Sequence, residues 1–389
     1  MIDSRDEPLL RRALELARAG IALASPNPYV GAVITDSQGN VVGEGTYTYA
    51  GMKHAEILAL EAAGEKASGG TLYINLEPHA HQGRTPPCTD ALIAAGIRRV
   101  VASMADPNPK VSGRGFEQLR AAGLQVEAGE LQEEAKTLNE AFARYIRSGI
   151  PFVTLKSAMT LDGKIAPAPA PQIAAKGNPH RNGFRGTWIT GESARAHVQE
   201  LRHQHDAVLV GIGTVLADDP LLNDRCGKPR RRSLLRVILD SHLRLPLDSQ
   251  VVRSAARERK NDLLVFCAAS GEMPSAEKQA HLQQLGICVE PVSLGADGRL
   301  DLHKVLRCLA RLEIMSVMIE GGSTLNGAAL ASGIVDKMFL YYAPKVLGDG
   351  AIPFVRSAGF SPVSLGTIRL HRFREDFAVE GYIRDPYAV

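Results

Sequence analysis

The sequence has no long apolar segment, few cysteines and little excess charge, and each shortage excludes a class of protein. No apolar run approaches the roughly 20 residues that span a bilayer, and the first residues lack the apolar core of a signal peptide. Five scattered cysteines do not form a disulfide framework, so we expect a cytoplasmic protein. A net charge of +3 over 389 residues gives no support for a nucleic-acid partner, and we expect no membrane partner.

The chain is long enough for two domains with full cores, and its pattern alternates between strands and helices. Residues 70–78 read as a strand, for example, and residues 130–149 as one helix that closes the first series. The Gly and Pro of Ser148–Pro151 interrupt the pattern. We therefore expect two independent α/β domains, formed by residues 1–148 and 152–389.

Two segments do not continue the pattern of strands and helices. Residues 166–186 are rich in Ala, Pro, Gly and Asn, and we expect a loop there, whose role the sequence leaves open. The basic run Lys228–Arg236 is interpreted as a solvated loop that leads into a strand.

A metal-binding pattern stands in the first half of the chain. His54 and Glu56 begin a predicted helix, and Cys88 begins another after the segment EPHAHQGRTPPC. Catalytic zinc takes three protein ligands and one water. Because successive helical residues turn by about 100°, Glu56 is not expected to bind the same ion as His54. It can instead face the bound water and carry its proton, as in zinc deaminases.

Residues 10–150 resemble the deaminase domain of the bifunctional deaminase/reductase family of riboflavin biosynthesis. The motifs SPNPYVGAVI, KHAE, GRTPPCTDALIAAGI and ADPNPKVSGRG carry the resemblance. It implies a cytidine-deaminase-like three-layer sandwich. It also implies Glu56 as the catalytic proton carrier and a zinc site made by His54, His79 and Cys88.

His79 is a departure, because the family normally has cysteine at this position. Two imidazoles and one thiolate leave the ion with a net charge of +1, whereas one imidazole and two thiolates leave it neutral. The bound water should then lose its proton more easily, although the resulting hydroxide, held by a more positive ion, is a weaker nucleophile than hydroxide on a neutral site. We favour a metal-binding, working site because the other motif residues are in place. The alternative is a reductase alone, with a deaminase domain impaired by His79. The nearby His81 could compete as a ligand.

Two residues are candidates for contact with the deaminase substrate. Asn27 could hydrogen-bond the pyrimidine edge, and its alternative role is an Asx turn before a strand. Arg84 could meet the ribose phosphate as a bidentate donor, and its alternative is a surface ion pair.

From Phe152 onward the sequence resembles the family's reductase domain, which is α/β and related in fold to dihydrofolate reductase. The motifs are LKSAMTLDGKIA, TWITGESAR, LRHQHDAVLVGIGTVLADDPLLNDR, VILDS and IEGGSTLNGAAL. The last runs from strand to helix through glycines, so backbone N–H groups at the helix start can hold a phosphate. A glycine pair of this kind is also often only a tight turn.

The resemblance implies NADPH as cofactor, although no residue chooses it over NADH. It places at the cofactor Ala158, Trp188, Thr214, Asp218, Ser241, Gly322, Ser323 and Thr324. It places at the substrate Lys156, Arg202, Leu222, Arg225 and Glu320. For Trp188 a role as a loop or core anchor is the alternative.

The sequence thus predicts a zinc- and NADPH-dependent bifunctional enzyme. Its first domain is expected to deaminate hydrolytically the diaminohydroxyphosphoribosylaminopyrimidine, and its second to reduce the ribosyl group of the resulting phosphoribosylaminouracil to ribityl. The substrate is a small pyrimidine ribotide, and the family implies a homo-oligomer formed through the reductase domain. An alternative of another class is a nucleic-acid-editing protein that reuses the deaminase fold, against which the reductase half argues.

Overall fold

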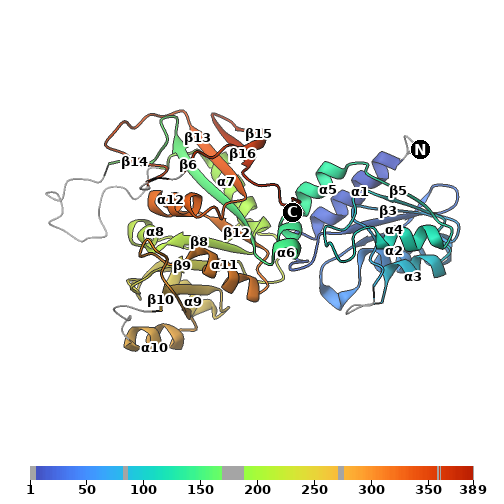
Figure 1. Cartoon of the computed structure of the whole chain (residues 1–389), viewed down its shortest axis with the longest axis horizontal. Helices are drawn as coiled ribbons and strands as arrows, with labels where there is room; N and C mark the ends of the chain where they lie inside the picture. The colour runs from blue at the N-terminus through green and yellow to red at the C-terminus, as the bar shows by residue number, and fades with distance from the viewer. Residues whose placement is uncertain are drawn as a thin grey trace. The chain divides into compact units, whose positions relative to one another are not determined.

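The computed structural model describes residues 6–81, 86–168, 188–269, 276–356, 359 and 361–388. The chain forms two compact units (Figure 1). The first contains Met1–Ile150 and Pro229–Arg232, and the second contains Pro151–Lys228 and Ser233–Ala388. Among the described residues, no helix has the length and apolar character needed to cross a lipid bilayer.

The first unit is built on one five-stranded sheet with the strand order β2-β1-β3-β4-β5. Strands β1 and β2 form an antiparallel hairpin, β1 also pairs with β3 in antiparallel fashion, and β3, β4 and β5 are parallel. The strands are β1 (Gly31–Thr35), β2 (Val41–Thr46), β3 (Thr71–Ile74), β4 (Arg99–Ala102) and β5 (Gln125–Ala128). Every residue of β1 is buried, as expected for a central strand covered on both faces.

Helices cover both faces of this sheet, which makes three layers (Figure 1). The helices are α1 (Asp6–Ala19), α2 (Ala55–Ala63), α3 (Cys88–Ala94), α4 (Arg114–Ala121), α5 (Gln132–Leu138) and α6 (Glu140–Ser148), with the short 3₁₀ turns η1 (Ala50–Met52) and η2 (Gly64–Ala67). A Cβ on Gly31 would lie 2.1 Å from the carbonyl oxygen of Ala13 in α1. A Cβ on Gly45 would lie 2.1 Å from the carbonyl oxygen of Ala55 in α2. Glycine therefore lets α2 approach the sheet closely, which fixes the position of its first turn.

Two expectations for the first unit are corrected. The single helix expected over residues 130–149 is broken at Asn139, which is buried and hydrogen-bonds the backbone of Tyr29 through both atoms of its amide. The basic run is not merely a solvated loop. The Arg231 amide donates to Ala22 O at 3.0 Å, and its guanidinium carbon lies 4.1 Å from the centre of the Tyr49 ring.

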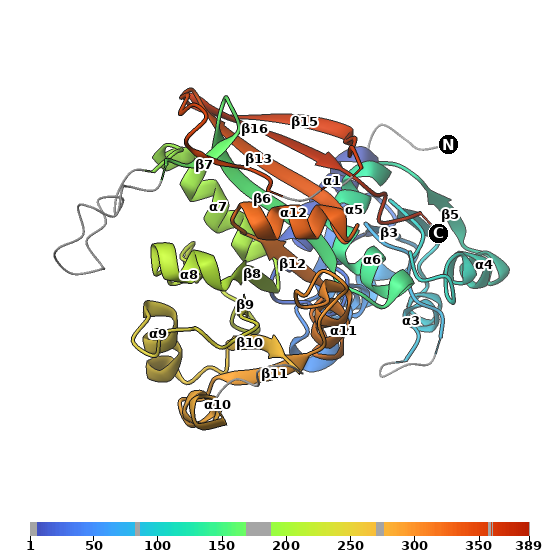
Figure 2. The same ribbon diagram turned by 60° about the vertical axis from the view of Figure 1, so that its left-hand side comes forward.

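The second unit is built on a nine-stranded sheet with the order β11-β10-β9-β8-β12-β6-β13-β16-β15. Figure 2 shows these strands one after another, from β15 at the top to β11 at the bottom. The strands are β6 (Phe152–Thr160), β8 (Ala207–Gly211), β9 (Leu235–Leu239), β10 (Leu263–Ala268), β11 (Cys288–Val292), β12 (Ser316–Ile319), β13 (Lys337–Ala343), β15 (Gly366–Phe373) and β16 (Asp376–Tyr382). Pairing is parallel from β11 to β13 and antiparallel between β13, β16 and β15. Strands β7 (Lys164–Ala166) and β14 (Ile352–Pro353) pair separately.

Alternate residues of the parallel strands enter two cores, one on each face of the sheet. Val208 and Val210 belong to one core, whereas Ala207 and Leu209 belong to the other. The first core is covered by α7 (Glu192–Gln204), α8 (Ile212–Asp218), α9 (Gln250–Glu258) and α10 (Ala276–Gln284), and the second by α11 (Leu302–Arg311) and α12 (Ser323–Ala331). Parallel strands whose carboxyl ends lie along one edge place the loops after β8, β9 and β12 together.

Candidate active sites

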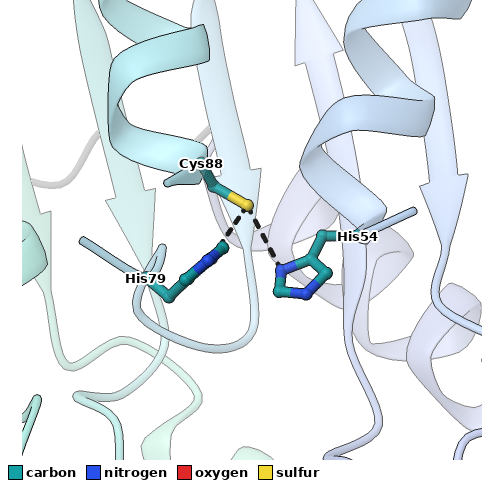
Figure 3. A group of neighbouring side chains, drawn as sticks. All are labelled: His54, His79 and Cys88. Atoms are coloured by element: carbon teal, nitrogen blue, oxygen red, sulfur yellow. Dashed lines mark hydrogen bonds between the residues drawn. The ribbon is translucent and has the colours of Figure 1, made fainter. Parts of the chain in front are cut away.

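Three side chains with metal-binding atoms converge in the first unit, as Figure 3 shows. The Cys88 sulfur lies 3.1 Å from His79 Nδ1 and 3.3 Å from His54 Nδ1. The centres of the two imidazole rings are 4.4 Å apart. The three donor atoms all lie within 4.8 Å of one another, a spacing that lets them bind one metal ion.

Two helix N-termini present these side chains. His54 directly precedes α2, and its carbonyl oxygen accepts a hydrogen bond from the Leu58 amide. Cys88 is the first residue of α3, and its amide donates to His79 O at 3.0 Å. The backbone of His79 therefore caps the helix that carries Cys88, which holds the two residues side by side. Both helix N-termini favour negative charge nearby, which suits a thiolate ligand.

Glu56 is the second residue of α2 and is only 3% exposed. Burial raises the pKa of its carboxyl group, and the nearby His54 opposes this shift. A raised pKa brings a carboxyl group closer to the range in which it can both take up and release a proton, as a general acid and base must.

The donor set fits zinc. Two imidazole nitrogens and one sulfur are ordinary zinc ligands, and three protein ligands leave one position for water. Burial, followed by the neighbouring Glu56, raises the pKa of the Cys88 thiol. A buried thiol beside a carboxylate becomes a thiolate only when a cation compensates its charge, which is the situation a bound metal provides.

The two substrate candidates of this unit have different outcomes. Asn27 donates from Nδ2 to the Tyr47 hydroxyl at 2.6 Å, and the Tyr47 ring meets His54 edge-on at 5.5 Å between ring centres. Asn27 therefore lies one side chain away from the metal-binding group. Arg84 lies outside the described residues, so its role stays a prediction.

Glu77 is a buried residue of this site that sequence reasoning did not single out. It follows β3, and its carboxylate accepts hydrogen bonds from four backbone amides, those of Asp106, Gly113, Gly115 and Phe116. These bonds tie the start of α4 to the segment that continues into His79. The only sequence signal was the Glu-Pro pair itself, since nothing local indicates the distant amides.

In the second unit, a buried ion cluster gathers three of the predicted substrate residues. Glu320 directly follows β12, and its carboxylate lies 2.6 Å from Arg202 Nε and 3.4 Å from Lys156 Nζ. The three side chains are 10–14% exposed. Burial alone would raise the pKa of Glu320, but Lys156 and Arg202 lower it to about 2. The carboxylate is therefore ionised and can accept hydrogen bonds from sugar hydroxyls.

The segment after α8 carries the other two predicted substrate residues. Arg202 Nη1 donates to Asn223 O at 2.9 Å, so the ion cluster is joined directly to this segment. Leu222 is 3% exposed with a φ of 57°. Partial burial lowers the pKa of Arg225, and the charges of Arg202 and Glu320 act on it in opposite directions. Arg225 Nη1 donates to Asn223 Oδ1 at 3.3 Å, so Arg225 is joined to the same residue that Arg202 contacts.

Replacing Glu320 by glutamine should lower the free energy of unfolding at pH 7 by about 3 kcal/mol, because two buried cations lose their counter-charge. The pKa of Glu320 in the folded chain, about 2, lies below its ordinary value of 4.5. The contribution of Glu320 is therefore full above pH 4.5 and is lost as the pH falls toward 2. Denaturant unfolding of both proteins at several pH values measures it. A difference that grows on acidification would contradict this prediction.

The start of α12 has the features of a phosphate site. Gly322 directly precedes the helix, and a Cβ there would lie 3.9 Å from Thr214 Oγ1 of α8. Ser323 Oγ is buried and, among the described residues, has no hydrogen-bond partner. Free amides at a helix start and a buried hydroxyl that needs a partner suit a phosphate oxygen. The structure thus brings together Gly322, Ser323 and Thr214, and Thr324 follows on the same first turn.

The remaining predicted cofactor residues stand on several elements of the second unit. Ala158 is on β6 opposite Tyr341, Asp218 ends α8, and Ser241 follows β9. Trp188 is 64% exposed, and its ring meets Arg195 at 4.9 Å. The place of Trp188 beside the cofactor stays a prediction.

Comparisons with known families match both units. A sequence model described as the cytidine and deoxycytidylate deaminase zinc-binding region matches residues 3–104, and one described as the RibD C-terminal domain matches residues 151–379. The riboflavin biosynthesis protein RibD of Actinobacillus pleuropneumoniae is 43% identical over 343 residues, which cover 88% of this chain and 85% of that protein. RibD of Escherichia coli is 40% identical over 359 residues, covering 89% and 90%.

Solved structures agree. RibD of Acinetobacter baumannii superposes with a TM-score of 0.80 at 34% identity, covering 97% of this chain and 98% of that one. The diaminohydroxyphosphoribosylaminopyrimidine deaminase/5-amino-6-(5-phosphoribosylamino)uracil reductase of Thermotoga maritima gives 0.78 at 36% identity, with the same coverage. The predicted fold class, a deaminase-like sandwich followed by a reductase domain, is confirmed. The chain belongs to the RibD family of riboflavin biosynthesis proteins and is a bifunctional enzyme with deaminase and reductase activities.

Proposed function

We propose that the chain catalyses two consecutive reactions on one pyrimidine ribotide. The first is hydrolytic deamination of the diaminohydroxyphosphoribosylaminopyrimidine, and the second is NADPH-dependent reduction of the ribosyl group of the product to ribityl. The convergence of His54, His79 and Cys88 beside the buried Glu56 supports the first reaction most directly. The name of the Thermotoga maritima relative supports the substrates. Nothing in the comparisons favours the reductase-only alternative.

In the deaminase we assign His54, His79 and Cys88 as the zinc ligands. Bound there, zinc would act as a Lewis acid that activates water for attack on the pyrimidine. Glu56 would take the proton of the attacking water and deliver it to the amine nitrogen, which leaves as ammonia. Asn27, held beside the site through Tyr47, would hydrogen-bond the pyrimidine edge, and Arg84 would bind the ribose phosphate.

In the reductase we assign Gly322, Ser323 and Thr324 to the cofactor phosphates and Thr214 to a contact beside them. We assign four further cofactor contacts on family position alone: Ala158, Trp188, Asp218 and Ser241. NADPH would supply a hydride to C1 of the opened ribose. Lys156 and Arg202 keep Glu320 ionised. Its carboxylate can therefore accept hydrogen bonds from the sugar hydroxyls and orient the opened ribose. Arg225 and Leu222 would bind the rest of the ribotide.

Four further assignments complete the proposal. The deaminase domain would span residues 1–148 and the reductase domain residues 152–389, which the two family matches support. The enzyme would assemble through its reductase domain. It would work in the cytoplasm, an assignment supported by five cysteines that form no disulfide.

The proposed phosphate site at the start of α12 leads to a specific test. Replacing Ser323 by alanine should raise the KM for NADPH by up to about tenfold, because the phosphate loses one hydrogen bond. The free energy of unfolding of the cofactor-free protein should stay equal or rise, since Ser323 Oγ has no partner among the described residues. Steady-state kinetics and denaturant unfolding measure the two effects. Replacement of Ser332, at the other end of α12, is the control. An unchanged KM with lowered stability would contradict the assignment.

The whole proposal is tested by assays of the purified protein. Ammonia release from the pyrimidine and NADPH consumption with the uracil product measure the two reactions separately. Activity in both assays supports the proposal. Reduction without deamination in zinc-loaded protein would establish the reductase-only alternative instead.

A further inference from the structure

A second group of metal-binding side chains lies in the reductase unit. It consists of His203, near the C-terminal end of α7, with Asp224 and Cys226 in the segment between α8 and β9. His203 Nδ1 lies 3.0 Å from Asp224 Oδ2, and these two side chains are 6% and 8% exposed. The donor atoms of all three residues lie within 4.8 Å of one another. Cys226 is partly exposed, so an ion and water can reach the group.

The chemistry and spacing of this group match those of the deaminase ligands. Both groups combine imidazole nitrogen with cysteine sulfur, and a carboxylate takes the place of the second imidazole. Such a nitrogen, sulfur and oxygen set suits zinc, whereas magnesium and calcium prefer oxygen ligands alone. A thiolate and a carboxylate together balance the charge of a divalent cation, which the deaminase ligands do only in part.

The local backbone already positions two of these ligands. The Cys226 amide donates to Asp224 Oδ1 at 3.0 Å, which closes a tight turn. The turn leaves Asp224 Oδ2 directed to His203 and keeps the Cys226 side chain near it. Little rearrangement is needed to bind an ion, because the three residues already share one small volume.

The site lies where it can affect the reductase. The segment is tied to α7 by Arg202 Nη1, which donates to Asn223 O at 2.9 Å, and by Gln199, whose Oε1 accepts from the Arg225 amide at 3.2 Å. The segment also carries Leu222 and Arg225, which we assign to the substrate. A cation bound by one ligand from α7 and two from the segment would fasten the substrate-binding segment to the helix.

We propose that His203, Asp224 and Cys226 form a second site for a zinc-like divalent cation, which links the segment of residues 222–226 to α7. This site is separate from the deaminase zinc. The cation site itself does not depend on the proposed reactions, whereas its effect on substrate binding rests on the proposed reductase function. It predicts that the reductase KM for the ribotide rises when the cation is removed and falls when it is restored.

The site is tested with cobalt in full-length protein that carries Cys88→Ser. This change removes the only sulfur ligand of the deaminase group, so a sulfur-to-cobalt charge-transfer band must come from another cysteine. We expect this band to saturate at about one cobalt ion per chain. Adding Cys226→Ser should abolish the band, and adding His203→Asn should weaken cobalt binding at least tenfold, by about 1.4 kcal/mol. Adding Cys288→Ser, at an exposed position on β11, should change nothing.

A band that is absent in the Cys88→Ser protein, or that survives Cys226→Ser, would overturn the proposal. A second measurement, of zinc content in protein that keeps Cys88, covers the case in which Cys88→Ser fails to fold. In otherwise unchanged protein dialysed against zinc, Cys226→Ser should lower the zinc content by about one ion per chain, and Cys288→Ser should leave it unchanged. Equal zinc in the parent and in Cys226→Ser would equally refute the second site. In that case the three residues form only a hydrogen-bonded tie, and the deaminase assignment stands.

Discussion

Replacing Glu56 by glutamine should lower the deaminase kcat by about 1000-fold and leave the reductase unchanged. Glutamine fills nearly the same volume, but it cannot carry a proton from water to the leaving amine. Glu56 is buried at the start of α2, and its raised pKa suits it to this transfer. Ammonia release measures the loss, and NADPH consumption with the uracil substrate measures the unaffected half.

The zinc content shows whether the loss of activity comes from lost proton transfer or from lost metal. The Glu56→Gln protein should bind as much zinc as the parent, because Glu56 is assigned to proton transfer and not to the metal. Glu65→Gln, an exposed change in the turn after α2, is the matched control and should keep full activity. Retention of more than a tenth of the deaminase activity by Glu56→Gln would contradict its role as the proton carrier.

Replacing His79 by alanine should remove the zinc of the deaminase site and abolish deamination. One of three protein ligands is lost, and the remaining pair, His54 and Cys88, cannot hold zinc tightly in competition with water. The loss of affinity should exceed the roughly 10–100-fold that follows the loss of a partner outside the coordination sphere. Metal analysis after dialysis, together with ammonia release, checks this prediction.

His81→Ala is the matched control for this change. The His81 ring meets His79 edge-on at 5.4 Å between ring centres, and His81 does not belong to the group of three. We expect it to keep its zinc and most of its activity. The reverse result, with zinc lost in His81→Ala and kept in His79→Ala, would transfer the ligand role to His81.

Secondary structure could be predicted from the sequence where the local spacing of apolar residues determines it. The strand expected over residues 70–78 contains β3, whose apolar residues are buried. The break at Asn139 could not be predicted, because its cause is a pair of hydrogen bonds to Tyr29, 110 residues away. Strand β15 was not expected either. Polar and apolar residues alternate from Thr367 to His371, but the apolar Ile368 and Leu370 are 58% and 75% exposed, so pairing with β16 and not burial of an apolar face makes this segment a strand.

In the candidate sites too, local motifs were visible in the sequence and contacts between distant residues were not. The residues alone indicated a metal-binding pattern around His54 and Cys88, and the family resemblance implied His79 as the third ligand. The role of Glu77 was not visible, since its four amide donors come from a segment about 30 to 40 residues later. The group of His203, Asp224 and Cys226 was not visible for a related reason. Only the packing of α7 against the segment after α8 brings these side chains together.

We propose that the imidazole of His79 binds zinc at the position where the family resemblance leads us to expect a thiolate. The deaminase kcat of the zinc-loaded parent, measured beside that of a His79→Cys variant at equal zinc content, tests it most directly. We predict two active enzymes with kcat values within about tenfold of each other, because both nitrogen and sulfur are good zinc ligands. A parent with almost no activity and a His79→Cys variant with a large gain would contradict it. That result would show that the chain with His79 is a reductase alone.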